Sequence, residues 1–460
     1  MAVWSEIAIS RTRFDKRLDP QFYQPQYLEN EKLLNEKNSK PLIALCSDVR
    51  CGPFGSAITV DDYRDIGTPF IRVSDTSDIF LKTDDLAFLN QRRAISFTRY
   101  EVEPDDIVVS QRGTVAQFSI VPDDYEKWII SANLISVQTS KNIDPYYLIA
   151  FLNSAIGTYQ LERLQSGQVQ PKIITDDIKH LLIYLPNKEL EKKVSATIKS
   201  SKGRQEKAKE LYAQAEHLLL SELGLDDPDL SPALFYERHF SETQQAARFD
   251  AEFFQPKYYA LRERLNKSTS LREGSTIGSI SKPLKYGTSA KLSYVEDGIP
   301  FLRIADLENK RFDEASVLRI SHEEASLQKN ARVSTGDVLI SRSGTLGLAV
   351  AIPDHLANSV FGSYFIRVKP DCTVIHPEFL ALYINALCGA LQVERLNTGG
   401  IQTNLTIPAI ESIFVVHGDM HWQMRFVEIV MKSVVARDES RRLLEEAKRM
   451  VEDAVLGRAV

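Results

Sequence analysis

The residues best suited to recognise a ligand lie in three pairs of polar segments, at matching places in the two halves of the chain. The first pair is GPFGS and YGTSAK, the second QRGT and RSGT, and the third QVQPK and QTN. They are residues 52–56 with 286–291, 111–114 with 342–345, and 168–172 with 402–404. Glycine, serine and threonine allow close backbone approach to a phosphate, while arginine, lysine, glutamine and asparagine carry donors that reach further.

These residue types are the ones that recognise nucleic acid. Arginine pairs with two acceptors of guanine, and glutamine or asparagine pairs with adenine, so the pattern predicts base-reading loops on a rigid scaffold. The alternative is ordinary turn chemistry, because Gly, Ser and Asn favour turns in any protein. For Arg72 and Arg303, an internal ion pair with the aspartate three residues later is a further alternative. The candidate DNA-contacting residues are Phe54, Ser56, Arg72, Gln111, Arg112, Gln168, Gln170, Lys172, Lys285, Tyr286, Ser289, Lys291, Arg303, Arg342, Ser343, Gln402 and Asn404.

The sequence carries no complete motif of a common catalytic site. A methyltransferase signature, an acid or amide followed by two prolines and an aromatic residue, is approached only by Asp144-Pro145-Tyr146-Tyr147, which lacks the second proline. There is no glycine-rich nucleotide-binding turn and no GxxxxGK[ST]. Pro122-Asp123-Asp124 is too short a fragment of a nuclease motif to be informative. We therefore expect a chain that is not an enzyme by itself and has no cofactor or metal of its own.

A repeat covers nearly the whole chain, at an offset of 231 residues. The segment GTPFIRVSD from Gly67 returns as GIPFLRIAD from Gly298, and DDIVVSQRGT from Asp105 returns as GDVLISRSGT from Gly336. We expect this offset to hold without gaps for over a hundred residues and to reach 233 at the final glycines. One register sustained over so many segments indicates a duplication, so both halves should share a fold.

Each copy has the pattern of an α+β domain. In the first copy we expect helices at 21–37 and 146–163, strands at 69–74, 106–111, 118–122, 129–138 and 180–186, and a joint to the second copy at 223–235.

A long helix follows each domain, at 187–224 and at 419–457. In both, small and apolar residues recur at the 3,4 spacing of a coiled coil. Each helix is about 50 Å long at ~1.5 Å per residue, so we expect the two to pair with each other as an antiparallel spacer. The alternative is two ordinary amphipathic helices that pack on separate domains.

The bulk properties place the chain among folded cytoplasmic proteins. Its 460 residues predict two to four domains, and its four cysteines show no metal-ligand spacing. No apolar run approaches the ~20 residues that span a membrane, and the first residues lack the apolar core of a secretory signal. The net charge of −6 argues against a protein that coats nucleic acid without preference.

The duplicated motifs resemble those of the specificity (S) subunit of type I restriction-modification systems, over almost the whole chain. The resemblance lies in G-[TI]-P-F-[IL]-R-[VI]-x-D, in D-[IV]-[VL]-[VI]-S-x-x-G-T, in the segments SGQVQPK and GGIQTNL before each last strand, and in the long helix after each domain. The openings at 19–27 and 250–258, with their leader, depart from many relatives.

The resemblance implies an α+β fold of two homologous target recognition domains, separated by an antiparallel coiled coil and related by a pseudo-two-fold axis. It implies that each domain reads one half of a split, asymmetric site in double-stranded DNA. The helices would dock two methyltransferase (M) subunits that carry S-adenosylmethionine, and restriction/translocase (R) subunits can join them. The expected domains are 1–186, the helix 187–224, the linker and second domain 225–418, and the helix 419–460.

Two other functions fit parts of the sequence. A duplicated DNA methyltransferase or nuclease would bind S-adenosylmethionine or cut DNA alone. A coiled-coil adaptor that joins two proteins would not contact DNA at all.

Overall fold

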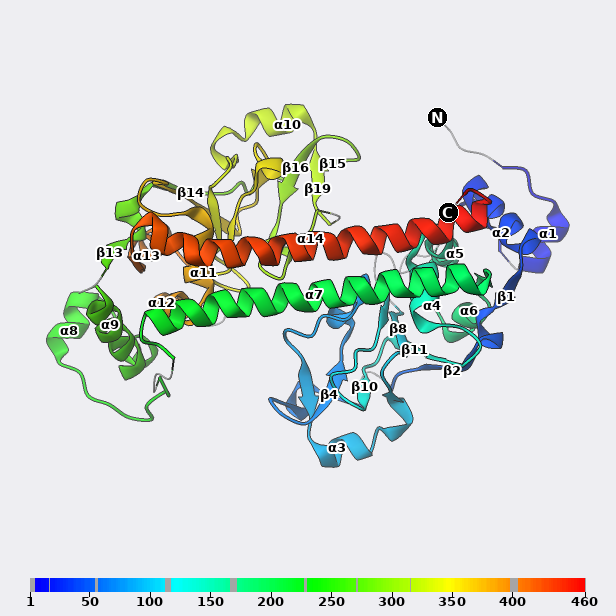
Figure 1. The fold of residues 1–460 in the computed structure, drawn as a ribbon, viewed down its shortest axis with the longest axis horizontal. Coiled ribbons are helices and arrows are strands. Elements are labelled where there is room, and N and C mark those ends of the chain that lie inside the picture. Colours follow the sequence, from blue (N-terminus) through cyan, green and yellow to red (C-terminus); the bar gives the residue numbers. More distant parts are fainter. Residues whose placement is uncertain are drawn as a thin grey trace. The chain divides into compact units, whose positions relative to one another are not determined.

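A computed structural model describes residues 5–15, 17–53, 57–111, 117–165, 172–226, 230–269, 272–314, 316–397 and 404–459. The chain divides into two units, and each contains one copy of the repeat with part of both long helices (Figure 1). The first unit is residues 1–206 with 436–460, and the second is residues 207–435. The domain limits expected from the sequence stay a prediction.

The first unit is built from two mixed sheets that helices cover. The strand orders are β3-β6-β4-β10-β7 and β2-β11-β8-β9-β5, and β1 pairs with β12. The helices are α1 Ile9–Asp15, α2 Pro25–Glu36, α3 Gln91–Ile95, α4 Pro145–Asn153, α5 Ala155–Gln165, α6 Thr175–Lys179 and the start of α7 Lys188–Glu222. The strands are β1 Ser39–Pro41, β2 Cys46–Cys51, β3 Tyr63–Arg64, β4 Thr68–Ile71, β5 Ile79–Phe80, β6 Ala87–Leu89, β7 Glu101–Val102, β8 Ile107–Ser110, β9 Phe118–Ile120, β10 Trp128–Ile130, β11 Leu134–Thr139 and β12 Leu182–Tyr184.

The second unit repeats this arrangement. Its sheets have the orders β15-β19-β16-β22 and β14-β23-β20-β21, with the pairs β13-β24 and β17-β18. The helices are α8 Phe240–Ala246, α9 Pro256–Ser268, α10 His322–Leu327, α11 Pro377–Asn385, α12 Leu387–Leu396, α13 Ile407–Glu411 and the start of α14 Met420–Leu456. The strands are β13 Glu273–Thr276, β14 Ser281–Tyr286, β15 Tyr294–Val295, β16 Ile299–Leu302, β17 Leu307–Glu308, β18 Arg311–Phe312, β19 Leu318–Ile320, β20 Val338–Ser341, β21 Ala349–Ala351, β22 Val360–Phe361, β23 Phe365–Pro370 and β24 Phe414–His417.

The strand registers confirm that the two halves share a fold. β4 runs parallel to β10 with Phe70 opposite Ile129, and β16 runs parallel to β22 with Phe301 opposite Val360. Both pairs differ by the same 231 residues. Side chains that alternate across the sheets therefore keep their faces in both copies, because a slip of one residue would turn every one of them over.

The gapless offset expected from the sequence is wrong in the segment that ends with β2 and β14. Cys51 of β2 lies opposite Ile135, and Tyr286 of β14 lies opposite Ile366, which makes the offset 235 there. From the start of α9 to the end of β14 the second copy is four residues longer than the first copy from the start of α2 to the end of β2, and its loop after β14 is four residues shorter than the loop after β2. These two length changes cancel, so the register is the same on either side of them.

Two predicted elements are broken in the structure. The strand expected at 129–138 is two strands in different sheets, because Asn133 adopts a left-handed φ of 65° between them. The helix expected at 146–163 is α4 and α5, and Ser154 between them is extended. The two corresponding helices of the second unit, α11 and α12, meet at 67°.

The two long helices pack antiparallel within each unit, which excludes the alternative of two separate amphipathic helices (Figure 1). In the first unit Ser201 Oγ donates to Ser440 O and Ser440 Oγ donates to Ser201 O, both at 2.9 Å. In the second unit Ser433 Oγ donates to Ala208 O at 2.6 Å. Small residues at these positions bring the two backbones close enough for a side chain of one helix to reach a carbonyl of the other.

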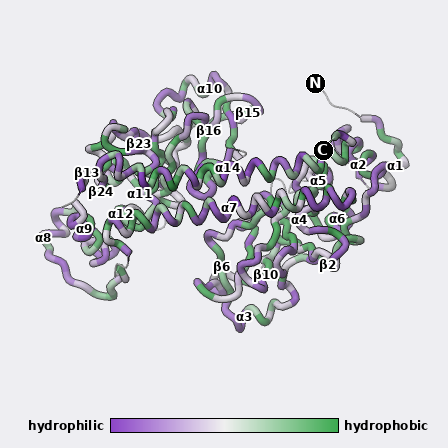
Figure 2. Tube along the Cα trace, in the orientation of Figure 1, coloured by the Kyte–Doolittle hydropathy of each residue, from purple (hydrophilic) through white to green (hydrophobic). Residues whose placement is uncertain are grey.

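Each core joins a domain to the helix pair. In the first unit Val194 and Ile198 of α7 and Val451 of α14 are buried in one cluster with the residues of α4. Polar and apolar residues alternate along α7 and α14 (Figure 2), as expected for helices with one buried face. Among the described residues no single helix is long and apolar enough to cross a membrane; the bent pair α11–α12 passes by length and composition together, and it is largely buried in its unit.

Candidate nucleic-acid interface

Three of the predicted residues meet at one edge of the second unit, although they come from distant parts of the chain. Arg342 follows β20, Tyr286 ends β14, and Asn404 precedes α13. The guanidinium of Arg342 donates to Asn404 Oδ1 at 2.8 Å and to Leu405 O at 3.2 Å, and it lies 4.7 Å from the centre of the Tyr286 ring. Arg342 therefore lies at the edge of the unit and also holds the segments of Asn404 and Tyr286 in place.

The backbone completes this cluster. Arg342 N donates to Tyr364 O at 2.8 Å, Leu405 N donates to Arg342 O at 2.9 Å, and Ser343 forms a bridge with Asn404. Tyr364 is 57% exposed and Tyr286 is 42% exposed. Tyr364 was not predicted, since a tyrosine between two strands gives no sign in the sequence that it is exposed. We call Tyr286, Arg342, Ser343, Tyr364 and Asn404 the second-unit edge.

The first unit has the same backbone arrangement with different side chains. Gln111 N donates to Asn133 O at 2.7 Å, and Ile173 N donates to Gln111 O at 3.0 Å. The side chain of Gln111 is buried and donates to Cys51 Sγ. Lys172 is exposed beside this cluster. Gln111 thus lies under the edge, where its backbone holds two neighbouring segments together.

The remaining lysines and serine of the prediction lie on the surface of the second unit. Lys285, Ser289 and Lys291 are exposed, and Lys285 Nζ donates to Asn330 Oδ1 at 3.2 Å. Lys291 and Ser289 follow β14 in the loop that begins at Gly287. Six further predicted residues lie outside the described residues: Phe54, Ser56, Arg112, Gln168, Gln170 and Gln402.

Arg72 and Arg303 form the internal ion pairs that the sequence left open. Arg72 N and Nη2 donate to Asp75 at 2.7 and 2.9 Å, and the Arg303 N donates to Asp306 at 2.8 Å. The hydrogen bonds to Asp75 and Asp306 raise the pKa of both guanidinium groups. These arginines close the turns after β4 and β16, which fixes where each strand ends.

A glycine at the start of each first loop is required by close packing. A Cβ on Gly52 would lie 2.1 Å from Ser131 O, and a Cβ on Gly287 would lie 2.1 Å from Gly362 O. The loops after β2 and β14 therefore begin directly against the segment that precedes β11 or β23. Close packing against the backbone explains these two glycines without any ligand.

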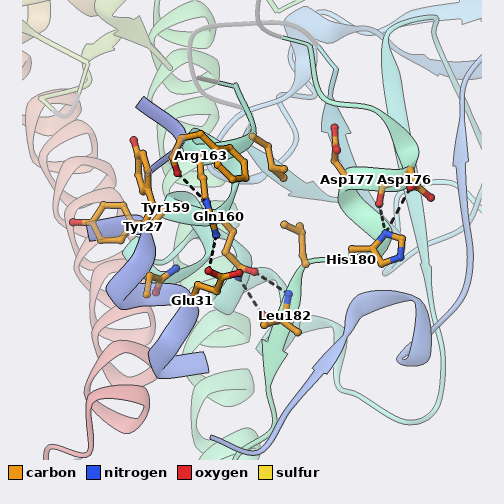
Figure 3. A pocket seen from close by; sticks show the side chains of 13 residues that line it. Tyr27, Glu31, Tyr159, Gln160, Arg163, Asp176, Asp177, His180 and Leu182 are labelled. Atoms are coloured by element: carbon orange, nitrogen blue, oxygen red, sulfur yellow. Dashed lines mark hydrogen bonds and ion pairs between the residues drawn. The ribbon is translucent and has the colours of Figure 1, made fainter. Parts of the chain in front are cut away.

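A cavity of about 220 Å³ lies where the opening of the first copy meets α5 and α6 (Figure 3). Its polar groups already serve the fold: Arg163 contacts Glu31 at 3.2 Å and lies 4.1 Å from the centre of the Phe22 ring, and Gln160 brackets the backbone of Leu182. In the second unit a cavity of about 250 Å³ has the same construction around Arg395.

We interpret both cavities as gaps in the packing between the opening segment and the rest of its domain, and not as substrate clefts. Among the described residues no group of three or more His, Cys, Asp or Glu side chains is placed to hold a metal ion.

Two buried aspartates precede the central strands, and neither has the surroundings of a catalytic acid. Burial raises the pKa of Asp106 to about 6, and it also raises the pKa of Asp337. Asp106 accepts from Glu103 N at 3.0 Å and Asp337 accepts from Ser334 N at 2.8 Å. Each carboxylate closes the turn that leads into β8 or β20, so its role is in the fold of both copies.

Comparison with known proteins agrees with the resemblance. Residues 53–215 match the family model of the type I restriction modification DNA specificity domain. The specificity subunit of the type I restriction enzyme EcoBI from Escherichia coli is 24% identical over 112 residues, which are 24% of this chain and 23% of that protein. The chain thus matches that curated relative over about a quarter of its length.

Solved structures of the same kind are similar over most of the chain. The HsdS subunit of Thermoanaerobacter tengcongensis is 14% identical with a TM-score of 0.30, covering 92% of this chain and 97% of that one. The type I restriction-modification S subunit of M. genitalium is 14% identical with a TM-score of 0.38, covering 91% and 94%. Because these TM-scores are below 0.5, the assignment rests on the sequence match. The chain is a relative of the type I restriction-modification specificity subunits, with a DNA specificity domain of that family at residues 53–215.

Proposed function

We propose that the chain is the DNA specificity subunit of a type I restriction-modification complex and has no catalytic activity of its own. The observation that carries this proposal is the family match of the first copy. The second copy has the same strand registers, so the same role extends to it. Each domain would then read one half of a bipartite site in double-stranded DNA.

The edge beyond β14 and β20 is the surface that we assign to DNA in the second unit. It combines exposed tyrosine rings with hydroxyl and amide groups, and the exposed Lys285 and Lys291 lie on the same strand and loop. Lysines position a domain on phosphates, and amide or guanidinium groups distinguish base edges. Arg72 and Arg303 are assigned to the fold, because Asp75 and Asp306 hold them.

The two halves of the site should differ in sequence. The second-unit edge has Tyr286, Arg342, Tyr364 and Asn404, whereas the equivalent places in the first unit have Cys51, Gln111, Asn133 and Lys172. The backbone hydrogen bonds are the same in both units. A common scaffold thus carries two different sets of side chains, which is what an asymmetric site requires.

The helices α7 and α14 would fix the gap between the half-sites and dock the partner subunits. DNA presents the same groove face once per ~34–36 Å turn, so a stiff spacer selects a defined separation. The proposed partners are two methyltransferase subunits, which would bind S-adenosylmethionine and methylate adenine, and restriction subunits can join them. The complex would act in the cytoplasm.

The test is to map methylated adenines in a host that carries the chain together with its methyltransferase partner. Single-molecule sequencing should show a bipartite motif that disappears without the chain. Replacing residues 1–185 by the corresponding domain of a relative should change one half of the motif, and replacing 234–417 should change the other half. A replacement that alters both halves together would contradict this division of labour.

The enzyme alternative has its own test. Calorimetry on the purified chain should show no binding of S-adenosylmethionine, and the purified chain should leave DNA uncut with or without Mg²⁺. Binding or cleavage by the chain alone would overturn the assignment as a non-catalytic subunit.

A further inference from the structure

An ion pair joins the first domain to the far end of α14. Lys448 of α14 contacts Asp78, which lies in the turn just before β5. Lys448 is only 13% exposed, and Asp78 and Glu445 together raise the pKa of its ammonium although burial opposes this. The contact lies wholly within the first unit.

The second unit has an ion pair at the same place with the charges exchanged. Glu216 of α7 contacts Lys310 at 3.6 Å, and the Lys310 ammonium also lies 4.3 Å from the centre of the Tyr212 ring. Lys310 lies in the turn just before β18. Both side chains are about 70% buried, at 31% and 28% exposed.

The repeat places these two contacts at the same helix position and in the same turn of each domain. Position 448 of α14 corresponds to position 216 of α7 at the offset of 232 that relates α4 to α11 and β12 to β24. At the offset of 231 in this turn, Asp78 corresponds to Asn309 and Lys310 corresponds to Ile79, so the two charged residues are neighbours in the same turn. The turn is left-handed in both copies, with Ile79 at φ 67° and Lys310 at φ 59°. The domain is acidic and the helix basic in the first unit, and the reverse holds in the second.

We infer that this exchange of charge determines which long helix each domain contacts at this position: α14 for the first domain and α7 for the second. Two domains of one fold present the same docking surface, so shape alone cannot distinguish the two places. If the domains were exchanged, Asp78 would face Glu216 and Lys310 would face Lys448. Like charges at partly buried positions are destabilising, and Lys448 would keep only Glu445 of its own helix as a counter-charge.

The same reasoning applies to two copies of this chain. A first domain that docked on the α7 of a second copy would place Asp78 against Glu216, and a second domain on another α14 would place Lys310 against Lys448. Only the arrangement seen within the chain satisfies both pairs. The charges at this contact therefore favour packing of each domain on the long helix that follows the other domain in the sequence. They disfavour packing on the helix that follows the same domain, and this preference does not depend on the DNA sequence that the domains read.

The experiment reverses the two helix charges in two full-length chains. One is the natural chain, and the other has residues 1–185 and 234–417 exchanged while both long helices stay in place. The double substitution E216K/K448E should lower the unfolding midpoint of the natural chain and raise that of the exchanged chain, by roughly 2–4 °C each. A shift in the same direction in both chains, or in neither, overturns the inference.

A second comparison covers the case in which the exchanged chain does not fold. In the natural chain, D78K/K310E added to E216K/K448E reverses all four charges and should restore the midpoint. No recovery overturns the inference. The matched control is E210K/R442E, which makes the same charge changes on the exposed faces of α7 and α14, where Glu210 and Arg442 pair only with residues of their own helix in the described contacts; it should act alike in both chains.

Discussion

Replacing Arg342 by methionine separates a supporting role from a base-reading role. Methionine keeps an apolar stem and removes the guanidinium, which loses the hydrogen bonds to Asn404 Oδ1 at 2.8 Å and Leu405 O at 3.2 Å and the contact with the Tyr286 ring. Hydrogen bonds from a charged donor contribute about 1.5–3 kcal/mol, and a partly exposed cation–π contact about 0.5–1 kcal/mol. Since the side chain is half-buried, we expect a loss of about 2–3 kcal/mol in the second unit.

Calorimetry of the full chain measures this loss. At about 2–4 °C per kcal/mol for a unit of this size, R342M should lower the midpoint of the second unit by roughly 5–10 °C and leave the first unit unchanged. R342K keeps the charge but not the fork of donors, so it should recover only part of the loss. The exposed Arg319, whose Nη1 donates to Gly298 O, provides the control R319M.

A double-mutant cycle identifies the mechanism. If Arg342 acts through Asn404, then R342M and N404A should be non-additive, with a coupling of about 1–2 kcal/mol. Methylation mapping of the same variants should then show a weakened second half of the motif and an intact first half. Additive effects on stability, with complete loss of recognition in R342M alone, would refute the supporting role and identify Arg342 as a direct reader of a base.

Three further predictions concern the scaffold. Asp106 has a folded pKa of about 6, above its unfolded value near 4, so its contribution to stability is present below pH 4 and is lost as the pH rises through 6. The loss amounts to roughly 3 kcal/mol, and D106N should abolish it. Measuring the free energy of unfolding at pH 4, 5, 6 and 7 tests this. Ser201→Leu should destabilise the first unit by about 1–3 kcal/mol by forcing α7 and α14 apart at the Ser440 contact, whereas Ser201→Ala should cost no more than about 1 kcal/mol; equal effects would contradict the close packing. G287A should destabilise the second unit strongly because its Cβ has no room, whereas G203A on α7, where nothing lies within 4 Å, should stabilise the first unit by about 0.5–1 kcal/mol.

The sequence was sufficient for features that depend on local pattern. The long helices follow from a spacing of small and apolar residues over many turns, and the shared fold follows from a repeat that spans strands and loops alike. The break at Asn133 could not be predicted, because one asparagine in an apolar run is compatible with a continuous strand. The left-handed residue there lies between two strands that belong to different sheets, and that pairing depends on residues distant in the sequence.

The compensated gap before β2 and β14 shows a different limit. A sequence compared with itself detects a change of register only if the register stays changed. Here the second copy gains four residues between the start of α9 and the end of β14 and loses four after β14, so the motifs on either side keep one offset. Only the hydrogen-bonded ladders reveal that Tyr286 is the counterpart of Cys51, and that Gly287 is the counterpart of Gly52.

The site residues were harder to rank, because side-chain type does not show where a side chain goes. Arg342 and Arg72 are both arginines beside a strand end, yet the aspartate that holds Arg72 is three residues away, while the acceptor of Arg342 is 62 residues away. The near partner was visible in the sequence as an alternative, and the distant partner was not. Gln111 likewise could not be recognised as buried, since its position depends on Cys51 and Asn133.

The duplication itself separates scaffold from reading surface. Where the two copies keep the same residue, its contacts are with the backbone or an internal partner: the arginine–aspartate turns at 72 and 303, the glycines at 52 and 287, and the glutamines at 160 and 392 that bracket the last strand. Where the copies differ although the backbone bonds are the same, the positions gather at one edge of each unit. A fold that had to read two different sequences would vary at that edge and keep the arginine–aspartate turns, the glycines and the glutamines that support it, and this contrast within a single chain is why we assign DNA to that edge.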